Sequence, residues 1–204
     1  MRALGLAPRE DLVLRLLHLQ RLLEKWNRVY NLSAIVAPQQ VIGRHFLESL
    51  AVVAHLQGAR ILDVGTGAGF PGLPLALACP EKRFVLLDSG AKKTRFVRQS
   101  VIELGIGNVD VVHGRVEDFR ADAGFDTIVT RAFSSLETIW AMTRRLLAPG
   151  GVLLAMKGRR FEDELRQLTG EVRAEVVALP VPGAPATGHL VRLTPVAPDQ
   201  RGGG

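Results

Sequence analysis

The chain of 204 residues is poor in cysteine and aromatic residues, and it has no long apolar run. A single cysteine, Cys79, excludes an intramolecular disulfide framework and a thiolate-rich zinc site, and it favours a reducing compartment. No apolar stretch approaches the roughly 20 residues that span a bilayer, and residues 1–10 lack the apolar core of a signal peptide. Aromatic residues make up only 5%, too few to stack successive bases of a long single strand. We therefore expect a cytoplasmic protein that does not bind a membrane.

Several catalytic patterns are also absent. The five histidines show no metal-ligand spacing, so we expect no metal site. No Gly-x-Ser-x-Gly elbow occurs, and no Gly-Lys-Ser/Thr follows a glycine loop, which excludes the usual serine-hydrolase and P-loop phosphate sites. Cys79 is expected in the core. What the chain does carry is positive charge: 26 Lys and Arg against 20 Asp and Glu give a net charge of +6, which makes a polyanionic partner a hypothesis.

The first 57 residues have a helical pattern. Leu12, Leu16 and Leu19 begin an apolar series at spacings of three and four within residues 11–29, which predicts an amphipathic helix. A second helix is predicted over residues 39–56, where Pro38 suits the first turn. Residues 1–57 are therefore expected to form a helical extension.

From residue 58 onward, short apolar runs alternate with helical segments, which predicts a parallel sheet. The expected strands are residues 60–64, 84–87, 109–112, 125–129, 151–156, 175–179 and 190–193. The expected helices are residues 73–78, 92–104, 136–147 and 161–169. Only a Pro/Gly-rich loop separates the last two strands, so they should form an antiparallel hairpin. This arrangement is typical of the α/β class I methyltransferase fold, with a Rossmann-like, seven-stranded, mostly parallel sheet, here expected in residues 58–196. Residues 197–204 are expected to form a disordered tail.

A glycine-dense turn after the first expected strand predicts a nucleotide site. The run is Asp63-Val64-Gly65-Thr66-Gly67-Ala68-Gly69-Phe70-Pro71-Gly72. Glycines let the backbone approach a ligand, and the following helix offers free N–H groups. The run also fits the dinucleotide expression Gly-x-Gly-x-x-Gly, with Asp88 21 residues beyond Gly67. Asp63 favours S-adenosylmethionine, because an acidic group suits its cationic amino-acid end and repels a pyrophosphate; a ligand-free turn remains an alternative.

Further candidates follow later strands. Asp88 ends the second strand and suits ribose hydroxyls, while the segment with Arg115, Val116 and Glu117 could hold an adenine or simply begin a helix. Arg131 ends the fourth strand, where chemistry occurs in this architecture.

Cations gather in two places that could bind RNA. Expected phosphate contacts are Lys92, Lys93, Arg95 and Arg98 on one helix, and Lys157, Arg159 and Arg160 after the fifth strand. An ordinary solvated helix face is the alternative for Arg95 and Arg98.

Six motifs in order carry a family resemblance. They are Lys25-Trp26-Asn27-Arg28-Val29-Tyr30-Asn31-Leu32-Ser33, His45-Phe46-Leu47-Glu48-Ser49-Leu50, the loop of residues 63–74, Asp88-Ser89-Gly90-Ala91-Lys92-Lys93, Thr130-Arg131-Ala132-Phe133 and Lys157-Gly158. Together they strongly resemble the bacterial glucose-inhibited division protein B family, the small-subunit ribosomal RNA (guanine-N7) methyltransferases.

The resemblance implies methyl transfer from S-adenosylmethionine to N7 of one guanine in a decoding-region loop of 16S rRNA, position 527 in the family. The cofactor residues that it implies are Gly65, Phe70, Asp88, Val116, Glu117 and Arg131. The chain departs from the family pattern at Glu48, where aspartate is usual, and at Gly188, where the family has an arginine.

Attack by N7 requires no general base, because this nitrogen carries an in-plane lone pair and no proton at neutral pH. Catalysis should then depend on alignment and exclusion of water. Arg131 or Lys157 could donate to guanine O6. Asn31 and His45 are placed near the cofactor, although Asn31 could only cap a turn and His45 could be an interhelical residue.

We expect a monomer, with 16S rRNA or the small subunit as partner. The competing hypotheses are a small-molecule or protein methyltransferase, a nicotinamide-dependent oxidoreductase, and a non-enzymatic RNA-binding assembly factor.

Overall fold

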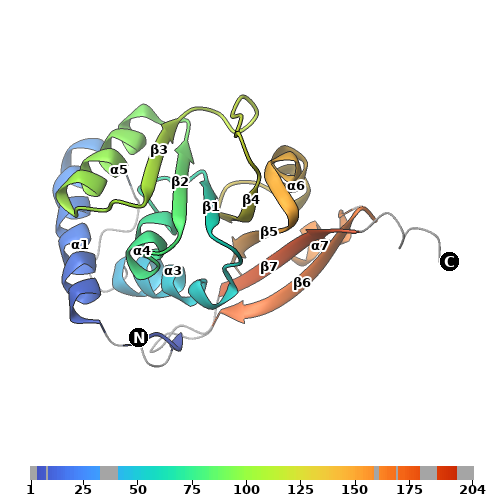
Figure 1. Ribbon diagram of the computed structural model, residues 1–204, viewed down its shortest axis with the longest axis horizontal. Coiled ribbons are helices and arrows are strands. Elements are labelled where there is room, and N and C mark those ends of the chain that lie inside the picture. Colours follow the sequence, from blue (N-terminus) through green and yellow to red (C-terminus); the bar gives the residue numbers. More distant parts are fainter. Residues whose placement is uncertain are drawn as a thin grey trace.

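Seven strands form one sheet in the computed structural model, which describes residues 4–7, 9–32, 41–158, 161–168, 170–179 and 188–196 (Figure 1). The strands are β1 (Arg60–Val64), β2 (Arg83–Asp88), β3 (Val109–His113), β4 (Phe125–Arg131), β5 (Leu147–Lys157), β6 (Val172–Leu179) and β7 (Gly188–Pro195). Their order is β3-β2-β1-β4-β5-β7-β6. Strands β1 to β5 pair in parallel, and β7 is antiparallel to both β5 and β6. The predicted sheet and its terminal hairpin are confirmed.

The helical elements come largely where the pattern predicts them. They are α1 (Glu10–Tyr30), η2 (Val41–Leu47), α3 (Glu48–Ala51), η3 (Val53–His55), α4 (Gly72–Ala78), α5 (Ala91–Glu103), α6 (Leu136–Thr143), η4 (Arg144–Leu146) and α7 (Glu162–Arg166). The second helix, expected as one continuous element, is instead broken into a π-helical stretch, a short α-helix and a 3-10 turn. Gly43 and the β-branched pair Val52-Val53 weaken helix propensity there.

The sheet is covered on both faces (Figure 1). Ile61 of β1 belongs to the core shared with α1, α4 and α5, whereas its neighbour Leu62 belongs to the core shared with α6. Both side chains have no exposed surface. Burial on both faces explains why these strands are nearly continuous apolar runs.

Two expected boundaries are wrong around residue 147. The helix expected over residues 136–147 leaves its α-helical form at Thr143, and β5 begins at Leu147 rather than at residue 151. Strand β5 runs through Pro149 and two glycines, with a register irregularity where it pairs with β4.

Helix α1 packs against the rest of the fold. Leu19 and Leu23 of α1 are buried, and Trp26 contacts Phe96 of α5 with ring centroids 5.7 Å apart. Cys79 is buried, as expected of a core residue. None of the described helices is long and apolar enough to cross a membrane. The predicted tail, residues 197–204, lies outside the described residues.

Candidate cofactor and catalytic site

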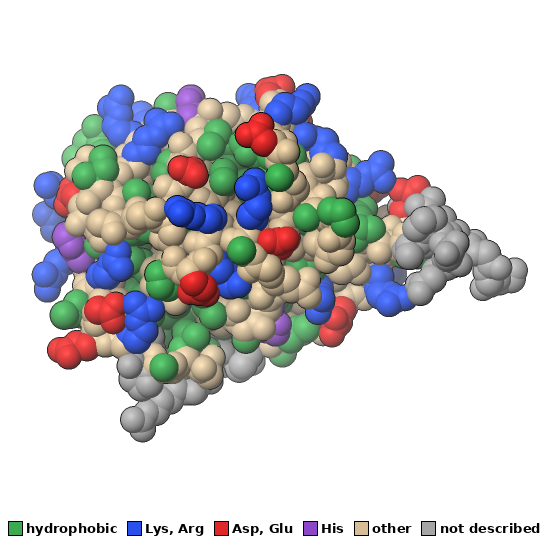
Figure 2. Space-filling model, in the orientation of Figure 1, with side chains coloured by type: hydrophobic (Ala, Val, Ile, Leu, Met, Phe, Trp, Pro, Cys, Tyr) green, Lys and Arg blue, Asp and Glu red, His purple; other side chains and the backbone are tan. Residues whose placement is uncertain are grey.

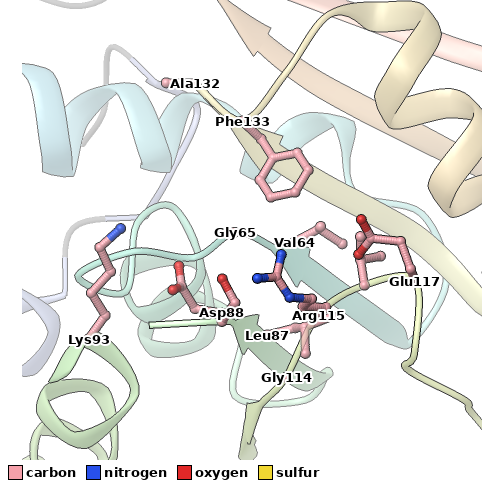
Figure 3. A pocket seen from close by; sticks show the side chains of 12 residues that line it. Val64, Gly65, Leu87, Asp88, Lys93, Gly114, Arg115, Glu117, Ala132 and Phe133 are labelled. Carbon is pink, nitrogen blue, oxygen red and sulfur yellow. The ribbon is translucent and has the colours of Figure 1, made fainter. Parts of the chain in front are cut away.

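A cavity of about 300 Å³ lies where β1, β2 and β4 end (Figure 3). Its lining consists of Val64, Gly65, Leu87, Asp88, Ser89, Lys93, Gly114, Arg115, Val116, Glu117, Ala132 and Phe133. The chain passes from β1 to β2 on one side, and β4 lies on the other side of β1, so this is the topological switch point of the sheet. The volume lies at the lower end of the range for small-ligand sites.

Asp63 holds the glycine turn from inside. Its Oδ2 accepts hydrogen bonds from Thr66 Oγ1 at 2.7 Å and from Gly72 N at 2.8 Å. The residue has no exposed surface, and within the described residues its buried Oδ1 has no hydrogen-bond partner. Burial raises the pKa of Asp63 to about 6, against the lowering effect of these two hydrogen bonds. The carboxyl group thus fixes the turn and leaves one polar atom unpartnered.

Gly65 is required by its neighbour Phe133. Its φ is +69°, and a Cβ there would lie 2.3 Å from Phe133 Cδ2. Figure 3 shows the Phe133 ring over Gly65, at the upper side of the cavity. Ala132, which precedes this ring, has a φ of 51°, a left-handed conformation that is strained for alanine. The turn after β4 therefore brings an aromatic side chain onto the glycine turn after β1.

Asp88 joins the glycine turn to the start of α5. Its Oδ2 accepts the N–H of Gly67 at 2.8 Å, and its Oδ1 accepts the N–H of Gly90 at 2.7 Å. The carboxylate lines the cavity, with Lys93 beside it (Figure 3). Each carboxylate oxygen has capacity for a further hydrogen bond. A ligand with two neighbouring hydroxyl groups could therefore bind here.

The opposite wall is the turn that carries Arg115, Val116 and Glu117 (Figure 3). Arg145, from η4, holds this turn by donating to Val116 O at 2.6 Å, to Phe119 O at 2.9 Å and to Glu117 O at 3.2 Å. The sequence contains no signal for this role, because Arg145 belongs to no motif and follows the turn by 26 to 29 residues.

Three predicted residues from distant segments meet in one cluster. Arg131 Nη2 lies 3.0 Å from His45 Nδ1, and the His45 ring stacks on Phe70 with centroids 4.5 Å apart and planes 13° apart. The Arg131 guanidinium also lies over the Phe70 ring, at 5.5 Å. Since an arginine can only donate, this contact requires His45 Nδ1 as acceptor and therefore a neutral ring. His45 is buried in this cluster and is not among the residues that line the described cavity, so its role near the cofactor stays a prediction.

Lys157 braces the turn after β4. Its Nζ donates to Ser134 O at 2.6 Å and to Glu164 Oε2 at 2.7 Å, and the same Glu164 oxygen accepts the N–H of Leu136. The Lys157 side chain is only 11% exposed. Its ammonium is thus engaged by the turn that carries Phe133, an arrangement that the sequence did not indicate.

The remaining predicted residues lie as follows. Lys92, Lys93 and Arg95 are all exposed on α5, and of these three only Lys93 lines the described cavity, which distinguishes the two lysines. Asn31 ends α1 in the left-handed conformation and is not among the side chains that line the described cavity. Gly69, with a φ of +86°, packs against Leu73. Arg159 and Arg160 lie outside the described residues.

No three His, Cys, Asp or Glu side chains converge on a metal-sized site within the part of the chain that the structure describes.

Solved structures with the same fold are methyltransferases. A methyltransferase from Geobacter sulfurreducens aligns with a TM-score of 0.62 and 19% identity, covering 93% of each chain. The O-methyltransferase TomG from Streptomyces achromogenes, solved in complex with S-adenosylmethionine, aligns with a TM-score of 0.59 and 18% identity, covering 94% of this chain and 92% of that one. The strand order and the cavity at its switch point are those of the class I S-adenosylmethionine-dependent methyltransferase fold.

Sequence comparison gives the family. The model of GidB, the rRNA small subunit methyltransferase G, matches residues 14–189. The ribosomal RNA small subunit methyltransferase G of Methylococcus capsulatus is 51% identical over 185 residues, which cover 91% of this chain and 90% of that protein. The chain belongs to the small-subunit rRNA methyltransferase G family, and the resemblance found in its motifs is confirmed.

Proposed function

We propose that this protein transfers the methyl group of S-adenosylmethionine to N7 of a single guanine, the family's position 527, in 16S rRNA. The observation that carries the proposal is the cavity at the switch point, which can take the two ribose hydroxyls of a nucleoside. Asp88 offers two carboxylate oxygens to this cavity, and the buried Asp63 holds the neighbouring glycine turn through Thr66 and Gly72. Family membership supports the substrate.

Different residues around the cavity would hold different parts of S-adenosylmethionine. Asp88 would accept the ribose hydroxyls, and Val116 and Glu117 would contact the adenine. Gly65, Gly67 and Gly69 keep the backbone close to the amino-acid end, with Asp63 acting through the turn it holds. Arg115 and Phe70 are the remaining residues that we propose for cofactor binding. When bound, S-adenosylmethionine supplies a methyl group on a sulfonium that leaves as a neutral thioether.

The chain's task in catalysis is to align the guanine and to exclude water. N7 attacks with its own lone pair, so this step requires no residue to accept a proton. Arg131 stands at the end of β4 with its guanidinium fixed by His45 and Phe70, which suits a donor to guanine O6. A donor to N7 itself would block the reaction. Lys157 positions the neighbouring turn through Ser134 and Glu164.

Substrate RNA would meet exposed cations on α5. Lys92 and Arg95 lie on its surface, beside the cavity edge that Lys93 forms. Contacts to phosphates make binding fall with salt.

The test uses unmethylated small subunits and labelled S-adenosylmethionine. Chain scission at N7-methylguanine should locate the label at one guanine of 16S rRNA, and Asp88→Asn should lower the cofactor affinity because the amide cannot accept at both positions. Glu175→Gln, on the exposed strand β6 and away from the cavity, serves as matched control. Label on a base other than guanine, on another guanine atom, or on ribosomal protein refutes the proposal.

A further inference from the structure

Helices α1 and α5 lie side by side and antiparallel. Arg15 of α1 donates to Leu104 O at 2.8 Å, His18 Nε2 lies 3.9 Å from Glu103 Oε2, and Trp26 packs on Phe96. As residue numbers rise along α1, those of its partners along α5 fall. The C-terminal half of α1 therefore lies beside the N-terminal half of α5.

These two halves carry exposed cations. On α1, Arg21, Lys25 and Arg28 are exposed and follow one another at spacings of four and three, so they form one stripe. Lys25 comes seven residues after His18, which places it on the side of α1 that adjoins α5. Across the helix boundary, Lys92 and Arg95 of α5 are exposed. We call these five side chains the α1–α5 basic surface.

The charge is uneven along the helix pair. Within the described residues, no member of the α1–α5 basic surface takes part in an ion pair. The one carboxylate in this half of α1, Glu24, accepts a hydrogen bond from Gln20 at 3.0 Å. Carboxylates gather at the opposite end of the pair, where Glu10, Asp11 and Glu103 lie. Figure 2 shows Lys and Arg side chains over the side of the molecule that α1 and α5 form in Figure 1.

The surface leads to the cavity. Lys92 is followed directly by Lys93, which lines the cavity beside Asp88, and α5 begins just after Asp88 ends β2. The stripe on α1 extends over seven residues, or about 10 Å of helix. At one phosphate per roughly 3.4 Å of duplex axis in each strand, this length faces about three phosphates. A polyanion lying along α1 would thus pass close to the site where the base must enter.

We propose that Arg21, Lys25 and Arg28 of α1 bind phosphates of the rRNA segment next to the target guanine, forming one surface with Lys92 and Arg95. This inference rests on the proposed function and extends its RNA contact from α5 to the helical extension. RNA is the occupant that the geometry favours, because the surface leads to the cavity through Lys93 and because its five cations outnumber the one carboxylate of these two helix halves. That carboxylate, Glu24, already accepts a hydrogen bond from Gln20.

The first experiment measures the salt dependence of binding to unmethylated small subunits. A plot of log affinity against log salt has a negative slope. The triple variant Arg21→Gln, Lys25→Gln and Arg28→Gln should make this slope less steep by about 2 to 3, since each lost phosphate contact reduces its magnitude by roughly 0.7–0.9. A matched variant, Arg60→Gln, Lys82→Gln and Arg83→Gln, removes the same charge at the amino ends of β1 and β2, on the opposite edge of the sheet. It should keep a slope close to that of the wild type.

Melting temperature and S-adenosylmethionine affinity are measured for both triple variants, and they should stay at the wild-type level in the α1 variant. If the two triple variants change the slope equally, the effect comes from net charge and the proposal is wrong. If the α1 variant binds the subunit with the wild-type slope, α1 makes no phosphate contact, which also overturns it.

A second experiment identifies the partner directly. A photocrosslinker attached at Lys25→Cys should label nucleotides of 16S rRNA, whereas one at Arg83→Cys should not; the native Cys79 is buried. Crosslinks from residue 25 to ribosomal protein alone would refute the RNA surface. These readouts do not depend on turnover, so a protein that binds through α1 and yet leaves guanine N7 unmethylated would refute the proposed function and not this inference.

Discussion

Asp63 should make the stability of the protein depend on pH. Its native pKa of about 6 lies above the unfolded value of 3.8, because the folded chain buries the carboxyl group completely. The stabilisation from its protonated form is therefore fully present below the unfolded pKa and is lost as the pH rises through about 6. A difference of 2.2 between the two values corresponds to about 3 kcal/mol, the free energy that ionised Asp63 costs above that range.

Urea unfolding of the wild type and of Asp63→Asn measures this cost. The amide cannot ionise, so the destabilisation caused by the substitution itself is the same at every pH. The effect of Asp63 ionisation is therefore the change with pH in the difference between the two unfolding free energies. We expect the wild type to lose about 2 kcal/mol of unfolding free energy relative to Asp63→Asn between about pH 4.5 and pH 7.5, most of the total. Asp118→Asn, at an exposed carboxylate, controls for loss of surface charge. Parallel curves for wild type and Asp63→Asn across this range would refute the burial argument.

Three further predictions concern the cavity walls. Arg145→Ala should weaken S-adenosylmethionine binding about tenfold, with Arg145→Lys intermediate, because the turn loses three hydrogen bonds; calorimetry checks this, and unchanged affinity contradicts it. Gly65→Ala should abolish cofactor binding through its clash with Phe133, and adding Phe133→Ala should restore part of it; no restoration would mean that backbone strain alone is responsible. Lys92→Ala should raise only the KM for small subunits, whereas Lys93→Ala should raise this KM and also weaken cofactor affinity. Equal changes of both quantities in the two variants would contradict different roles for these lysines.

Much of the sheet was predictable because its central strands are buried on both faces. A short apolar run such as residues 84–87, with charged residues and glycine on its flanks, is typical of a buried strand. Each of the seven expected strands is present. The start of β5 was not predictable, since Pro149 and Gly150 normally end a strand and here lie within the register irregularity between Leu147 and Val152. The break in the second helix has a different origin, because Gly43 and the Val52-Val53 pair lower the local helix propensity.

The position of Asp88 follows from sequence order. It ends β2 and lines the cavity, because parallel strands end at one edge of the sheet. Phe133 also lines the cavity, but the sequence did not single it out as a site residue. Pairings across the chain were beyond reach. The contact between His45 and Arg131 spans 86 residues and depends on how η2 packs over the glycine turn. Arg145 binds only backbone carbonyls, and these carry no residue identity from which a partner could be inferred.

The polar groups around the cavity share one physical role. Asp63 and Asp88 bind backbone N–H groups of the glycine turn, Arg145 binds carbonyl groups of the opposite turn, and Lys157 binds the turn after β4. Each fixes a loop whose backbone would otherwise be free at the point where a ligand must be aligned. A reaction without proton transfer derives its rate from alignment, so rigidity of these three turns is the contribution the chain can make. This explains why charged side chains bind these turns at positions that need not touch the reacting atoms.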